Sequence, residues 1–118
     1  STGASNDLRE ASELARRLVT KYGMSEKLGP MTFGKTEELI FLGREIATEK
    51  NYSEKVATEI DSEVHSFIER TYKAAQKIIS VNKNALEKIA KTLMEKETLE
   101  QDEFYNLLKP FKIKPMAV

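Results

Sequence analysis

Apolar residues recur at helical spacing in four stretches of the chain. In the first stretch they return every three or four positions while charged residues occupy the other side, which predicts an amphipathic helix over residues 6–22. Asp7 and Glu10 have capping-box spacing at its start, and Gly23 suits the left-handed residue that often ends a helix.

The second stretch predicts a long helix that Ser53 caps and that ends near Val81. At about 1.5 Å per residue it reaches some 40 Å, so we expect part of it to contact a neighbouring domain or subunit. Its charged positions, Asp61 and Glu63 among them, are predicted to form a solvated face of mixed sign.

Asn82 or Asn84 starts a third predicted helix, and the two asparagines suit a tight turn that packs it antiparallel to the second. Thr98 or Glu100 opens a short fourth helix, which Pro110 stops. The predicted fold class is therefore all-α: a helical bundle with a long helical hairpin, in one folding unit of 118 residues.

Two segments lack the helical period. Residues 24–51 are punctuated by glycines and carry an apolar run at 39–42, which predicts an extended, structured loop with a short strand or hairpin. Residues 111–118 read as a poorly ordered tail. The roles of loop and tail are not evident from the pattern.

Composition excludes several classes of function. Lys plus Arg and Asp plus Glu are each 19, so no basic excess is available for nucleic acid. The absence of cysteine excludes disulfides, thiolate metal sites and cysteine nucleophiles. No apolar run approaches the roughly 20 residues that span a bilayer. The first residue is not methionine, and we expect a fragment of a longer protein.

The residues do not supply a complete catalytic site. A catalytic zinc ion takes about three protein ligands, whereas this chain has a single histidine, His65, and no His-Glu-x-x-His motif. We interpret His65 as a surface residue of the long helix. The glycines form no phosphate-binding loop, so any ATP site lies in another module. By pattern alone, Asp7 is a helix cap or a favourable charge near the helix N-terminus.

Ordered blocks of sequence nevertheless resemble one family. Residues 2–8 read Thr-Gly-Ala-Ser-Asn-Asp-Leu, and further blocks follow in the same order and spacing at residues 22–30, 41–44, 52–57, 60–64 and 97–99. Together they resemble the C-terminal helical part of the peptidase domain of FtsH-type ATP-dependent zinc metalloproteases, peptidase family M41. The resemblance covers nearly all of residues 1–118.

The resemblance implies a role for Asp7. In that family two histidines of a His-Glu-x-x-His helix and the aspartate of the Gly-Ala-Ser-Asn-Asp block hold Zn²⁺, and this aspartate falls on Asp7. The glutamate of the same motif activates the water that attacks the peptide bond. Because this glutamate and the histidines are missing here, the chain alone is predicted to be inactive, with no catalytic residue of its own.

The resemblance also implies a larger assembly. The full chain is expected to carry transmembrane helices and an AAA ATPase module that binds ATP, and to form a homohexamer in a bacterial inner membrane with the peptidase domain facing the cytoplasm, or in an organellar membrane. Its substrates are expected to be misfolded or unassembled membrane proteins and soluble regulators. The alternative is a non-catalytic helical module for assembly or adaptor binding.

Overall fold

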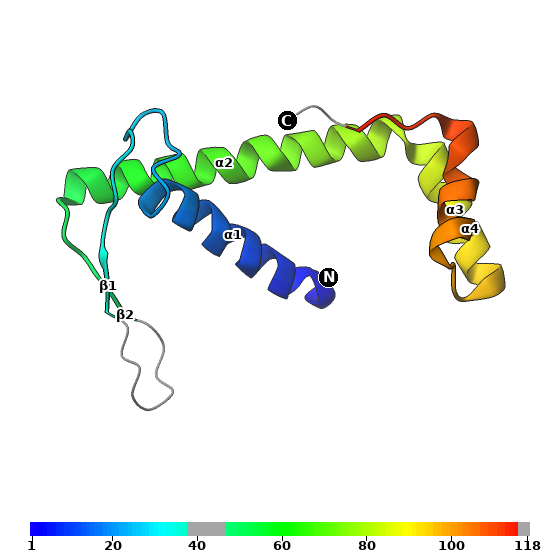
Figure 1. The fold of residues 1–118 in the computed structure, drawn as a ribbon, viewed down its shortest axis with the longest axis horizontal. Coiled ribbons are helices and arrows are strands. Elements are labelled where there is room, and N and C mark those ends of the chain that lie inside the picture. The colour runs from blue at the N-terminus through cyan, green and yellow to red at the C-terminus, as the bar shows by residue number, and fades with distance from the viewer. Residues whose placement is uncertain (38–46, 116–118) are drawn as a thin grey trace. The chain divides into compact units, whose positions relative to one another are not determined.

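A computed structural model describes residues 1–37 and 47–115 (Figure 1). The chain divides into two compact units, Ser1–Arg70 and Thr71–Val118, and helix α2, Glu54–Val81, belongs to both. The expectation of a single folding unit is therefore wrong. The physical reason is the length of α2, since its 28 residues extend well past the elements that pack on its first half.

The first unit begins with a 3-10 turn, Thr2–Ala4, that continues directly into helix α1, Ser5–Thr20. Ala4 is the N-cap residue of α1, and no side chain caps the helix. The predicted capping box is thus wrong, because the preceding turn places Asp7 inside the first helical turn rather than at its cap. An acidic residue in a first turn still interacts favourably with the helix dipole.

Gly23 ends the α1 region in the predicted left-handed conformation. Its φ is +61°, and the Met24 N–H donates to the Leu18 carbonyl oxygen over 2.9 Å. The chain then folds back, so that the Phe33 N–H donates to the Thr20 carbonyl oxygen over 2.7 Å. The helix itself ends two residues before the predicted Tyr22.

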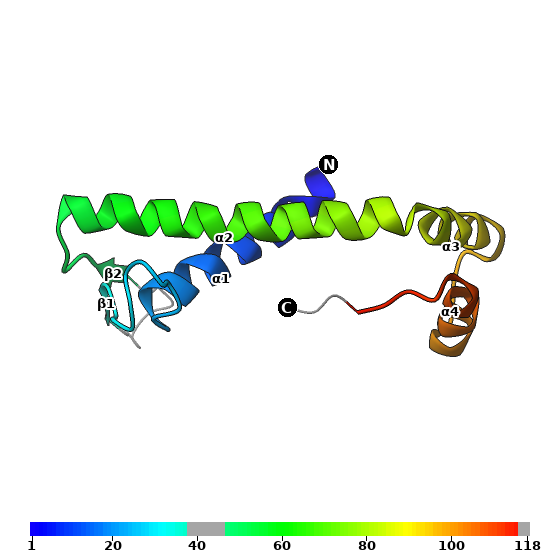
Figure 2. The same ribbon diagram turned by 90° about the horizontal axis from the view of Figure 1, so that it is seen from above.

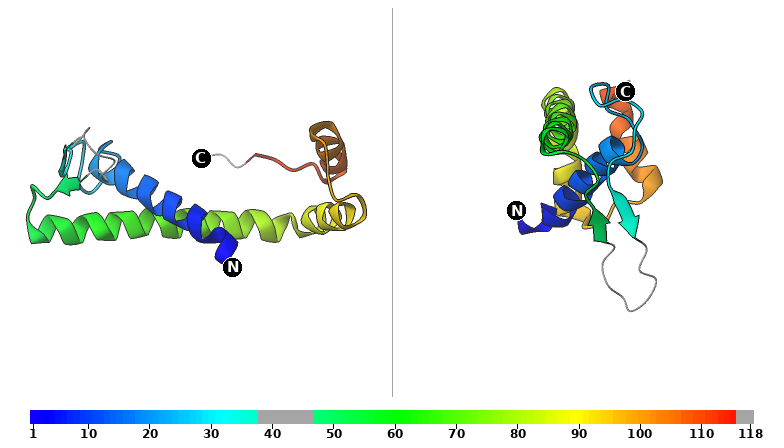
Figure 3. Two further views of the ribbon diagram at one scale, coloured as in Figure 1. Left: turned by 90° about the horizontal axis from the view of Figure 1, so that it is seen from below. Right: turned by 90° about the vertical axis from the view of Figure 1, so that its left-hand side faces the viewer.

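The predicted hairpin in the loop is confirmed. Strands β1, Lys35–Glu37, and β2, Ala47–Glu49, pair antiparallel with Thr36 opposite Thr48 (Figure 3). At its base the Gly34 N–H donates to Asn51 Oδ1 over 2.7 Å. The apolar run at 39–42 and the block at 41–44 lie outside the described residues.

Helix α2 begins and ends as predicted. The Val56 N–H donates to the Ser53 hydroxyl oxygen over 3.2 Å, which confirms the cap, and the last residue is Val81. Helix α1 crosses α2 obliquely (Figures 1 and 2). Ala15 and Val19 of α1 and Ile60 of α2 are buried, and they form the small apolar core of the first unit.

The second unit holds the end of α2, helices α3, Lys83–Lys96, and α4, Gln101–Leu108, and a 3-10 turn, Lys109–Phe111. The predicted antiparallel packing of the second and third helices is wrong, since α3 turns away from the end of α2 and packs against α4 (Figures 1 and 2). Asn82 alone joins α2 to α3, whereas a helical hairpin needs about two to five connecting residues.

The start of α4 is as predicted. Glu100 is its N-cap, and Glu103 completes a capping box with the Glu100 backbone N–H. The Lys96 ammonium donates to the Glu103 carboxylate over 2.6 Å. The hydrogen bond from Lys96, the backbone N–H of Glu100 and the charge of Lys96 together lower the pKa of Glu103.

A lowered folded-state pKa gives the sign of a pH effect at Glu103. The stabilisation is present above the pKa of the unfolded carboxyl and is lost as pH falls through the folded pKa. We therefore expect Glu103→Gln to lower Tm slightly at neutral pH and not at acid pH, as measured by circular dichroism. Asp102→Asn, in the same helical turn, is the control, and an equal pH-dependent loss there would contradict the assignment.

The all-α class is confirmed, with a three-residue hairpin as the β-structure of the described residues. Among residues 1–37 and 47–115, no helix is both long and apolar enough to cross a bilayer.

Candidate functional site

Asp7 lies in the first turn of α1 with an exposed side chain. The polar residues around it bond to one another: Asn6 Nδ2 donates to Glu10 Oε1 over 2.9 Å, and Arg9 donates to Asn6 Oδ1. No hydrogen bond or ion pair joins Asp7 to another residue in the part of the chain that the structure describes. Its carboxylate is therefore free for an external partner.

This arrangement fits one ligand of a metal site. A free carboxylate is a zinc-ligand type, and a zinc site requires further ligands that converge on it. Within residues 1–37 and 47–115, no three His, Cys, Asp or Glu side chains come together in this way. His65 is exposed on α2, as expected for a surface residue. The role of Asp7 as a zinc ligand stays a prediction.

Two polar contacts fix the α1 region on α2. Arg16 Nη2 of α1 lies 3.3 Å from Asp61 Oδ1 of α2, in an exposed ion pair. The Ser25 hydroxyl, just after α1, donates to Glu63 Oε2 of α2 over 2.7 Å. The prediction that Asp61 and Glu63 form only a solvated face is thus wrong, because α1 and the following loop pack on this part of α2.

Ser25 is the buried centre of these contacts, since its residue is 2% exposed. Its hydroxyl oxygen also accepts the Leu28 N–H over 3.1 Å, which closes the tight turn after Met24. One side chain therefore joins the loop to α2 and shapes the loop itself. Sequence reasoning assigned no role to Ser25, because only the folded chain shows that a loop serine faces a helix carboxylate.

Ser25→Ala is expected to lower the free energy of unfolding by about 1–3 kcal/mol, because a partly buried carboxylate and a backbone N–H lose their partner. Urea unfolding followed by circular dichroism measures this loss. Ser12→Ala is a matched control, since the Ser12 hydroxyl donates only to the Leu8 carbonyl oxygen on the exposed face of α1. We expect the control to change stability by less than about 0.5 kcal/mol, and equal losses would contradict the anchoring role.

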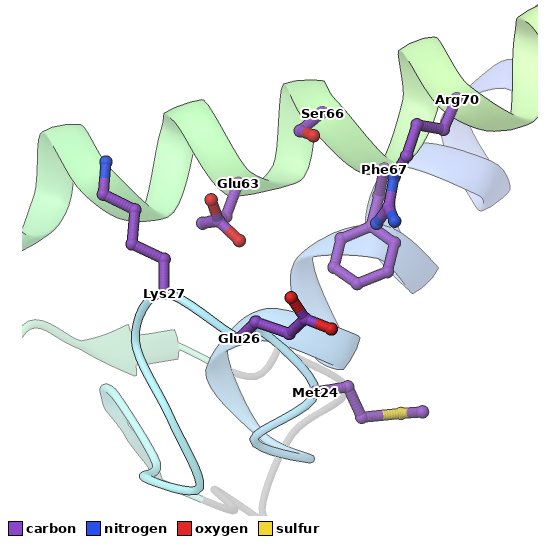
Figure 4. A pocket seen from close by; sticks show the side chains of 7 residues that line it. All are labelled: Met24, Glu26, Lys27, Glu63, Ser66, Phe67 and Arg70. Carbon is purple, nitrogen blue, oxygen red and sulfur yellow. The ribbon is translucent and has the colours of Figure 1, made fainter.

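A groove of about 570 Å³ lies between this loop and α2 (Figure 4). Its lining comes from two segments of the first unit and comprises Met24, Glu26, Lys27, Glu63, Ser66, Phe67 and Arg70. The Arg70 guanidinium stacks over the Phe67 ring at 4.8 Å from its centroid. The sequence gave no signal for this groove, because its two sides are some 40 residues apart along the chain.

Comparison with known proteins decides the family. The model of peptidase family M41 matches residues 1–107 of the chain. The chain belongs to peptidase family M41. Over 108 residues, or 92% of its length, it is 54% identical to the ATP-dependent zinc metalloprotease FtsH of Caldicellulosiruptor bescii. Over all 118 residues it is 52% identical to the ATP-dependent zinc metalloprotease FtsH 1 of Thermomicrobium roseum.

A third relative, the ATP-dependent zinc metalloprotease FtsH of Chloroflexus aggregans, is 45% identical over 99% of the chain. The M41 chain corresponds to only 18% of the length of each of these relatives. The resemblance found from the ordered sequence blocks is thereby confirmed. The activity of a whole protein remains a matter for proposal, since most of each relative has no counterpart in these 118 residues.

Proposed function

We propose that this M41 chain is the C-terminal helical part of the peptidase domain of a membrane-anchored, ATP-dependent zinc metalloendopeptidase. Asp7 supplies the third zinc ligand, and the helices support it and contribute to a homohexamer. A bound zinc ion lowers the pKa of its water and polarises the peptide carbonyl. The substrates are misfolded or unassembled membrane proteins and soluble regulators, and ATP acts in a separate module.

The observation that carries this proposal is the free carboxylate of Asp7 in a chain that belongs to family M41. Its neighbours Asn6, Arg9 and Glu10 are engaged with one another and brace the first turn of α1. Such i, i+3 and i, i+4 pairs stabilise a helix by about 0.2–0.5 kcal/mol each. The turn is therefore held without using Asp7, which is the arrangement a ligand-bearing turn requires.

The proposed location is the inner membrane of a bacterium, with the peptidase domain in the cytoplasm, or an organellar membrane. The printed names of the relatives support zinc, ATP and proteolysis. The location, the substrates and the hexamer rest on the family resemblance. Separating membrane from soluble protein in the source cell tests the location directly.

The decisive experiment compares the full-length protein with the isolated 118-residue chain. We expect the full-length protein to hydrolyse casein in the presence of ATP and to hold one zinc ion per chain, with hydrolysis stopped by a chelator and restored by zinc. The isolated chain is expected to show no peptidase activity and no stoichiometric zinc, because one carboxylate is too few ligands.

The alternative function is a non-catalytic helical module for assembly or adaptor binding. It predicts that the full-length protein leaves casein intact at saturating ATP and zinc. Stoichiometric zinc and proteolysis by the isolated chain would contradict the fragment assignment instead. The two results therefore distinguish an error about activity from an error about which residues form the site.

A further inference from the structure

The second unit exposes many large apolar side chains. Among its described residues, 71–115, Ala85 is the one buried apolar residue. Ten large apolar residues are exposed there, namely Tyr72, Ile78, Ile79, Val81, Leu86, Leu93, Met94, Tyr105, Phe111 and Ile113. A soluble monomer rarely exposes apolar area on this scale, which marks an interaction surface.

The charges of the two units are complementary. Residues 71–118 contain nine lysines, no arginine and six acidic residues, whereas residues 1–70 contain ten basic and thirteen acidic residues. The chain as a whole is neutral, with 19 charges of each sign. Opposite charge on two surfaces of one chain favours contact between the first unit of one copy and the second unit of another.

Helix α3 carries this basic and apolar character on an exposed surface. Lys83, Lys88 and Lys91 are exposed and form no ion pair in the described part of the chain, whereas Lys96 already pairs with Glu103. Leu86 and Leu93, one heptad apart, are 50% and 38% exposed. We call this set, Lys83, Leu86, Lys88, Lys91 and Leu93, the α3 surface. It presents ammonium groups beside apolar side chains.

The groove of the first unit has matching chemistry. Glu26 points toward the Phe67 ring, and the side chain of Lys27 extends away from that ring (Figure 4). Glu63 supplies a second carboxylate, and its bond to buried Ser25 fixes it in place. An ammonium group can lie beside the carboxylates while its aliphatic stem packs on Phe67. The Arg70 guanidinium stays stacked on the other part of that ring.

From these complementary surfaces we infer that the groove between the Met24–Lys27 loop and α2 binds the α3 surface of a second copy of this chain. The contact is heterologous, because a different surface of each copy takes part, and repetition of such a contact closes into a ring when the rotation allows. This inference rests on the proposed assembly into a homohexamer, and it names the residues that make one of its contacts.

Sedimentation equilibrium of the 118-residue chain tests the contact. We expect self-association that weakens when salt rises from about 0.05 M to about 0.5 M, because salt screens the charges. Glu26→Lys is expected to weaken association about tenfold or more, since it places an ammonium against the α3 lysines. Glu13→Lys is the matched control, since Glu13 is an exposed acidic residue of α1 outside the groove.

A mixed-copy experiment tests which surfaces meet. A second variant carries Lys83→Glu, Lys88→Glu and Lys91→Glu, all at exposed positions, with helicity checked by circular dichroism. Each variant alone is expected to associate weakly, and their mixture is expected to form heterodimers, because the reversed groove and the reversed α3 surface are again complementary. A monomer at every concentration, equal effects of Glu26→Lys and Glu13→Lys, or no recovery in the mixture would overturn the inference.

Failure here is separable from failure of the proposed function. If the chain stays monomeric while the full-length protein still hydrolyses casein with zinc and ATP, only the contact is wrong. If the full-length protein is inactive and lacks zinc while the mixed variants associate as expected, the contact stands and the proposed peptidase role does not.

Discussion

Asp7→Ala in the full-length protein is expected to abolish ATP-dependent casein hydrolysis, with a loss of about 100-fold or more, and to lower bound zinc. Asp7 contributes little to folding, because its exposed carboxylate makes no hydrogen bond or ion pair in the described part of the chain. We therefore expect ATP hydrolysis, hexamer formation and unfolding temperature to change little. Casein hydrolysis, zinc content and thermal unfolding are measured on the same preparation.

Glu13→Ala is the matched control for Asp7→Ala. Both residues are exposed carboxylates of α1, and Glu13 lies outside the matched Gly-Ala-Ser-Asn-Asp block. We expect the Glu13 variant to retain proteolysis and zinc. If the Asp7 variant also retains both, Asp7 is only a favourable charge near the helix N-terminus, and the zinc assignment is wrong.

Gly23→Ala is expected to destabilise the first unit by about 2–5 kcal/mol in urea unfolding. The φ of +61° disfavours any side chain by about 1–2 kcal/mol. A Cβ atom at this position also lies 2.8 Å from the Pro30 Cα and 3.1 Å from the Pro30 carbonyl carbon. Forcing these backbone atoms apart adds about 1–3 kcal/mol, typical of overpacking.

Gly29→Ala separates the two contributions. Gly29 also has positive φ, +75°, but a Cβ atom there meets nothing within 4 Å. We expect this control to lose only the conformational part, about 1–2 kcal/mol. If the two variants lose the same stability, the close approach of Pro30 to Gly23 does not contribute, and the packing of the loop against the end of α1 is wrong.

The Gly23 variant also bears on the candidate site. Gly23 directs the chain into the turn that places buried Ser25 against Glu63, and this contact forms one wall of the groove. A displaced loop therefore loses both the anchor and the groove. Sedimentation of Gly23→Ala is expected to show weaker self-association than Gly29→Ala.

The local pattern determined the helices because helix formation depends on spacing and capping within a few residues. Ser53 caps α2, Val81 ends it and Glu100 caps α4, as predicted. The error at Asp7 is also local: a 3-10 turn ahead of α1 extends the helical backbone upstream of the expected cap. Ordered sequence blocks then gave the family, which the match over residues 1–107 confirms.

The amphipathic stripe of α1 did not reveal how much of it is buried. Ala15 and Val19 are buried, whereas Leu8 and Leu14 are 66% and 50% exposed. Periodicity reports which face of a helix is apolar, but burial depends on where another element crosses it. Helix α2 covers only part of the α1 stripe, and this crossing comes from the loop that Gly23 and Ser25 shape.

By itself, then, the sequence determined the positions of the helices, the family and the candidate ligand Asp7, because these depend on residue type and order. The tertiary structure alone decided that α3 turns toward α4 rather than back along α2, that Ser25 binds Glu63, and that a groove forms beside Phe67. These features depend on contacts between residues distant in sequence, and the free energy of such contacts is set by geometry that no local pattern encodes.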